Sequence, residues 1–77
     1  MQLEIITPEK DLYQGEVELI SLPGSDGSFG LLNDHASIVS TLKAGEIKIL
    51  ENGTEKTFTV NGGVVEVNNN KVVVLAE

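Results

Sequence analysis

The chain has no cysteine, no tryptophan and no arginine among its 77 residues. Without cysteine, neither a disulfide framework nor a cysteine-ligated metal can stabilise the fold, which fits a reducing compartment. One tyrosine and two phenylalanines are the only aromatic residues. A free-standing adaptor or carbohydrate-binding module should show a stripe of exposed aromatic side chains, so this scarcity disfavours that class.

Positive charge is also scarce. Twelve acidic residues face five lysines, which gives a net charge of −7. Nucleic-acid binding is disfavoured because neutralising phosphates requires a basic face. Direct adsorption to an anionic bilayer is disfavoured for the same reason, so any membrane association would be indirect. A triphosphate site is equally improbable, whereas basic or neutral protein partners remain open.

Long apolar runs are missing as well. The longest, residues 72–76, has five residues, far short of the ~20 that cross a bilayer as a helix. Strand-like sequence follows Met1 directly, so we expect no signal or transit peptide. With 40% hydrophobic residues, the chain can build one core, and we expect a single domain over residues 1–77.

Apolar and polar residues alternate with a period of two along most of the chain, which is typical of half-buried strands. The apolar members of these runs are Leu3 and Ile5, Val17 and Leu19, Ile47 and Ile49, Phe58 and Val60, Val65 and Val67, and Val72 and Val74. Glycine, proline and asparagine predict turns at 8–10, 14–15, 23–24, 44–45, 52–53, 62–63 and 68–70. A helical turn at 41–43 is possible but not required. The pattern predicts two antiparallel sheets packed face to face.

The glycine-rich stretch 22–37 could be a phosphate cradle, a catalytic loop or a partner surface. Gly24, Gly27 and Gly30 are spaced GxxGxxG, which matches neither a dinucleotide fingerprint nor a P-loop. No helix follows to point its amides at a phosphate, and Asp26 would repel one. These glycines are better explained as corners of a sheet.

The residue types of a catalytic triad lie close together in the sequence at Asp34, His35 and Ser37. Neighbours in an extended segment point to opposite faces, so Asp34 cannot easily orient His35. The GxSxG nucleophile elbow is absent, and a zinc site would need acids from distant positions. A small acidic hydrolase is therefore the weaker hypothesis, and a partner surface and an ordinary loop remain about equally supported.

The stretch LPGSDGSFGLLNDHASIVSTLKAGEIKI resembles the signature of the ATP synthase epsilon subunit family: a Gly-x-x-Gly-x-x-Gly corner, an apolar pair, His-Ala, two apolar residues and a Leu-Lys-x-Gly turn. VNGGVVEVNNNKVVVLAE is similar to the family's Gly-Gly-x-x-Glu-Val hairpin and final strand. LEIITPEKDLYQGEVELI is similar to its first hairpin. Departures include Asn33, Asp34 and Ser37, where the family commonly has Pro-Gly and proline, and Ser28 in place of an acid.

This resemblance implies a flattened antiparallel β-sandwich of about ten short strands. It implies a non-catalytic rotor subunit in the central stalk of a proton-translocating F-type ATP synthase, with no cofactor and no metal. The partners would be the gamma subunit and the c-ring, at the cytoplasmic face of a bacterial inner membrane. Many members add a pair of helices after the position of Glu77, and we expect a naturally short form.

The resemblance also implies two contact surfaces. The expected gamma-subunit contacts are Thr7, Pro8, His35, Ala36, Ile38 and Ser40. The expected c-ring contacts are Ser25, Asp26, Gly27 and Ser28. We expect Asp26, His35 and Ser40 to be exposed, with Asp26 taking the role of the acid missing at Ser28.

Overall fold

The computed structural model describes residues 1–32 and 37–77. They form seven strands: β1 (Gln2–Ile6), β2 (Asp11–Glu16), β3 (Leu19–Gly24), β4 (Gly27–Leu31), β5 (Ile38–Glu51), β6 (Thr54–Asn68) and β7 (Lys71–Ala76). No helix occurs in these two ranges, and residues 41–43 belong to β5. The predicted all-β class is confirmed.

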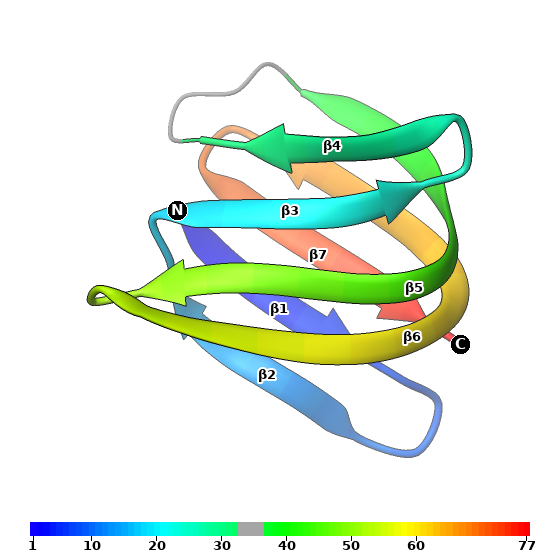
Figure 1. The fold of residues 1–77 in the computed structure, drawn as a ribbon, viewed down its shortest axis with the longest axis horizontal. Coiled ribbons are helices and arrows are strands. Elements are labelled where there is room, and N and C mark those ends of the chain that lie inside the picture. The colour runs from blue at the N-terminus through cyan, green and yellow to red at the C-terminus, as the bar shows by residue number, and fades with distance from the viewer. Residues whose placement is uncertain (33–36) are drawn as a thin grey trace.

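The strands form one sheet in the order β2-β1-β7-β6-β5-β3-β4. β5 and β6 are long and bend midway, which folds the sheet into two facing layers (Figure 1). Layer A contains β3, β4, residues 45–51 of β5 and residues 54–60 of β6. Layer B contains residues 38–43 of β5, residues 62–68 of β6, β7, β1 and β2. The expected count of about ten strands was too high, because β5 and β6 cross both layers without ending.

The strand pairing also differs from the prediction of two separate antiparallel sheets. The β5–β6 hairpin keeps one register from Ile38↔Val67 to Glu51↔Thr54, so a single ladder joins the layers. β1 and β7 pair in parallel, while the other neighbouring strands are antiparallel. The first and last strands therefore lie side by side in layer B, while the two chain ends lie at opposite ends of this strand pair.

The core lies between the layers and follows the predicted alternation. No polar or charged side chain is buried among the described residues. The core residues lie on every strand but β2, or directly beside a strand end in the case of Met1 and Val17. They are Met1, Leu3, Ile5, Val17, Ile20, Leu22, Leu31, Leu42, Ile47, Ile49, Val60, Val65, Val67, Val72, Val74 and Ala76. Dense packing between the two layers makes the domain stiff.

A polar contact joins the layers at the edge formed by β2. The Tyr13 hydroxyl donates a hydrogen bond to Oε2 of Glu51 at 2.6 Å, and Lys56 Nζ lies 2.8 Å from Oε1 of the same carboxylate. The Tyr13 ring packs against Phe58 with 5.6 Å between centroids. Burial and the Glu51 hydrogen bond raise the pKa of Tyr13 to about 12. Hydrogen bonds from Lys56 and Tyr13 hold the pKa of Glu51 below its usual value.

We expect Tyr13→Phe to lower the melting temperature by a few degrees at neutral pH, because a hydrogen bond to a charged acceptor is lost at a partly solvated site. Thermal unfolding followed by circular dichroism measures the change. The folded pKa of Tyr13 exceeds the unfolded value of 10.0, so this contribution is complete below pH 10 and is lost as the pH rises towards about 12. In a Glu51→Ala background the same substitution should have a smaller effect; an equal effect would show that the hydroxyl acts without Glu51.

Candidate functional site

The tip of the β3–β4 hairpin presents the four predicted c-ring contacts, with two residues in the turn and two at the start of β4. Ser25, Asp26, Gly27 and Ser28 are all exposed. The Ser25 amide donates to the carbonyl of Thr41 at 3.0 Å, and the Thr41 hydroxyl donates to Ser25 Oγ at 2.8 Å. These bonds fix the turn to β5. Asp26 therefore lies on an anchored, solvent-exposed corner, as the sequence predicts.

The connection between β1 and β2 carries Thr7 and Pro8. The Thr7 amide and hydroxyl both donate to the carbonyl of Lys10, at 2.8 and 2.9 Å, which closes this connection into a tight turn. Pro8 is exposed and Thr7 is half-buried. Both residues line a hollow of about 240 Å³ together with Leu75 from β7. Thr7 and Pro8 thus adjoin the outer side of layer B.

The remaining predicted gamma-subunit contacts divide into two groups. Ile38 and Ser40 are half-buried on the core-facing side of β5, opposite buried Val67 and Val65. The expectation that Ser40 is exposed was wrong, because the alternation of β5 turns Val39 and Thr41 outwards instead. His35 and Ala36 lie outside the described residues.

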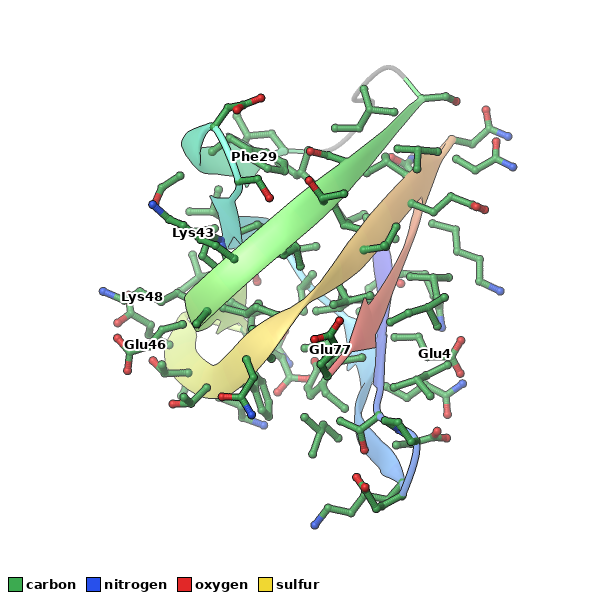
Figure 2. All side chains as sticks on the ribbon, turned by 90° about the vertical axis from the view of Figure 1, so that its right-hand side faces the viewer. Glu4, Phe29, Lys43, Glu46, Lys48 and Glu77 are labelled. Atoms are coloured by element: carbon green, nitrogen blue, oxygen red, sulfur yellow. The ribbon has the colours of Figure 1, made fainter. Side chains whose placement is uncertain are left out.

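The outer face of layer B carries apolar side chains that point into solvent. Cross-strand pairing forms two adjacent rows, Val39–Glu66–Val73–Glu4 and Thr41–Val64–Leu75–Ile6. Val39 is 71% exposed and Leu75 is 54% exposed. We call the set Ile6, Val39, Val64, Val73 and Leu75 the apolar outer patch. Figure 2 shows Glu4 on this outer side and Glu46 and Lys48 on the opposite side, over layer A.

Shallow hollows mark the same face. One of about 250 Å³ is lined by Val64, Glu66, Val73 and Leu75. Another of about 380 Å³ is lined by residues including Val39 and Glu66. Apolar side chains gathered on an uneven, exposed sheet face are typical of a surface that contacts another protein.

The sequence analysis did not assign the apolar outer patch, although the sequence holds a signal for it. A strand with one solvated face alternates apolar and polar residues, whereas residues 72–76 are apolar at every position. Val39 directly follows Ile38, and Val64 directly precedes Val65, so these two valines also break the alternation. Continuous apolar strands are typical of sheets covered on both faces. Such runs therefore indicate a face that needs a partner.

The metal-site and hydrolase hypotheses depend on acidic, histidine and serine side chains. In residues 1–32 and 37–77, no group of three or more His, Cys, Asp or Glu side chains could hold a metal ion. Ser37 is exposed, while Asp34 and His35 of the hydrolase hypothesis lie outside the described residues. No bilayer-spanning helix occurs in the described part of the chain.

A family model described as "ATP synthase, Delta/Epsilon chain, beta-sandwich domain" matches residues 1–77. The chain belongs to this family. ATP synthase epsilon chains are among its relatives: that of Desulforamulus reducens is 40% identical over 76 residues, which are 99% of this chain and 58% of the relative. That of Caulobacter vibrioides is 34% identical and is covered over 90% of its length. That of Campylobacter lari is 46% identical and is covered over 60%.

Solved structures with the same fold come from mitochondrial ATP synthases. A chain in the Tetrahymena thermophila central stalk and c-ring matches with a TM-score of 0.83 and 20% identity over 97% of this chain and 61% of its own length. A chain in the Euglena gracilis enzyme matches with a TM-score of 0.89 and 23% identity over 96% of this chain and 48% of its own length. At such identities these likenesses establish the fold. The family model confirms the predicted family, and these structures agree with the predicted β-sandwich.

Proposed function

We propose that this chain is a non-catalytic rotor subunit in the central stalk of a proton-translocating F-type ATP synthase. It binds the gamma subunit and the c-ring and so couples ion flow to rotary ATP synthesis. The whole complex is membrane-associated, and the chain lies peripherally at the cytoplasmic face of a bacterial inner membrane. The proposal rests on family membership over residues 1–77, which we take to be one domain.

The apolar outer patch is the observation that best supports a role in binding another protein. A side chain such as Val39, 71% exposed on a stiff sheet, leaves apolar area in water that a partner would remove. We place the gamma subunit on this patch, reaching Thr7 and Pro8 at one side and Ile38 and Ser40 at the edge of β5. His35 and Ala36 complete the proposed gamma contacts. The net charge of −7 would speed association with a basic partner.

The tip of the β3–β4 hairpin is the proposed c-ring contact. Residues 25–28 are exposed and belong to layer A, so they are not part of the outer face of layer B. Their hydrogen bonds to Thr41 hold the turn in place. A rotor component needs such an anchored contact to transmit torque. The carboxylate of Asp26 would accept hydrogen bonds from the polar loops of the c-ring.

Calorimetric titration of the purified chain with the matching gamma subunit tests the proposal. We expect a saturable one-to-one complex, weakened about tenfold or more by Leu75→Ser because an apolar side chain at the centre of an interface is lost. Leu19→Ser is the matched control, since Leu19 is 38% exposed on layer A. A folded chain that shows no binding would refute the proposed function, and equal weakening by both variants would refute the assignment of the face.

A further inference from the structure

One charged side chain lies inside the apolar outer patch. Glu66 on β6 is paired directly with Val39 on β5 and with Val73 on β7. Val64 precedes it by two residues on the same face of β6. Glu66 is exposed and lines hollows of about 250 and 380 Å³ on this face. Its carboxylate is thus bordered by apolar side chains on three sides.

The carboxylate of Glu66 has no cationic partner among the described residues. The ion pairs found there join Glu16 to the N-terminal ammonium group and Glu51 to Lys56. Lys71 is the cation in the adjoining cross-strand row, where it is paired with Asn68. No ion pair between Lys71 and Glu66 is formed. In the free chain, water therefore solvates the Glu66 carboxylate.

A partner that covers the apolar outer patch would remove this water. Burying an unpaired carboxylate costs far more than the surrounding valine contacts return, so a purely apolar partner surface would be rejected. A lysine or arginine placed opposite Glu66 would instead form a charge-assisted hydrogen bond inside an apolar ring. The patch therefore selects its partner by charge as well as by shape.

We propose that Glu66 is a specificity-determining residue that pairs with a lysine or arginine on an otherwise apolar partner surface. The inference rests on the proposed function, which makes this partner the gamma subunit. The negative charge of the chain as a whole, −7, accords with a partner surface of the opposite sign. The apolar ring supplies contact area, and the Glu66 pair fixes the register of the two surfaces.

Titration of the full chain with the gamma subunit tests this role. Glu66→Gln keeps the size of the side chain and removes its charge, which leaves the partner's cation unpaired. We expect roughly 30-fold weaker binding or more, the change measured when one member of a buried interfacial pair is truncated. The affinity of this variant should also fall less steeply with salt than that of the wild type. Circular dichroism should show an unchanged fold.

Two control variants make the result specific. Glu46→Gln removes the same charge from an exposed position over layer A (Figure 2), and it should change the affinity by less than about threefold. Lys71→Gln should have an equally small effect if Glu66 pairs across the interface.

Three outcomes would overturn the proposal in different ways. Binding of Glu66→Gln within about threefold of the wild type would refute the role of Glu66 while the proposed function stands. An equal loss in Lys71→Gln and Glu66→Gln, with no further loss in the double variant, would show that the pair forms within this chain. A folded wild-type chain that binds no gamma subunit would refute the proposed function and this inference together.

Discussion

Gly63→Ala is expected to unfold the domain. Gly63 lies just after the bend of β6, with φ at +146°, a conformation that disfavours any residue with a side chain. A Cβ atom there would overlap the Leu75 carbonyl oxygen and would lie 3.0 Å from Cα of Ala76, closer than van der Waals contact allows. Both neighbours are backbone of the adjacent strand β7, so relief requires the β6–β7 ladder to separate.

The expected loss for Gly63→Ala is more than ~3 kcal/mol, because backbone strain of about 1–3 kcal/mol adds to the steric overlap. A domain of this size rarely has more than ~3–5 kcal/mol of stability in total. Urea denaturation followed by circular dichroism would then show little or no folded baseline. A normal transition close to that of the wild type would show that β7 can shift at no great cost.

Gly27→Ala provides the matched control for this result. Gly27 has a similar φ of +131°, but nothing lies within 4 Å of the position of its Cβ atom. The substitution should therefore cost only the backbone strain, about 1–3 kcal/mol. The difference between the two variants isolates the contact with β7. Equal losses would assign the whole effect to φ.

The alternation of apolar residues predicted most of the core because a side-chain period of two is a local property. Leu3 and Ile5, for example, are fully buried as expected. Leu19 is 38% exposed, although it alternates with buried Val17. The reason is that β2 ends at Glu16 and β3 begins at Leu19, so the period restarts between these two residues.

The turn signals were correct where the chain reverses and wrong where it only bends. Asn52 and Gly53 have φ of 50° and 77°, as a type I′ hairpin requires, and they join β5 to β6. Gly15 lies within β2, so the turn expected at 14–15 was wrong. Gly45 and Gly62 mark the bends of β5 and β6, where the paired strands continue in one register. Glycine permits both outcomes, and only long-range pairing decides between them.

The candidate contact surfaces were only partly predictable. The exposed corner at residues 25–28 follows from its glycine spacing and short polar side chains. The apolar outer patch joins Ile6, Val39 and Leu75 from three separate strands, and its composition depends on the parallel pairing of β1 with β7. That pairing joins residues about 70 positions apart, and no local sequence signal specifies it.

Leu3→Ala and Leu75→Ala are expected to separate the core from the contact surface. The two leucines lie on neighbouring strands of layer B, Leu3 with no exposure and Leu75 54% exposed. Leu3→Ala removes the same atoms from the packed interior, where the lost burial and the remaining cavity together cost about 2–5 kcal/mol. Leu75→Ala removes them from a solvated face, so its effect on stability should stay within about 0.5 kcal/mol.

Binding should show the opposite order under conditions where both variants are folded. Leu75→Ala is expected to weaken binding of the gamma subunit, because the apolar outer patch loses a central contact. Leu3→Ala should bind with near-normal affinity once titrations are corrected for the folded fraction, since its side chain never reaches the surface. Urea denaturation and calorimetry on the same preparations measure the two effects. If Leu75→Ala lost stability and kept its affinity, the outer face of layer B would be a structural surface and the gamma subunit would have to bind elsewhere.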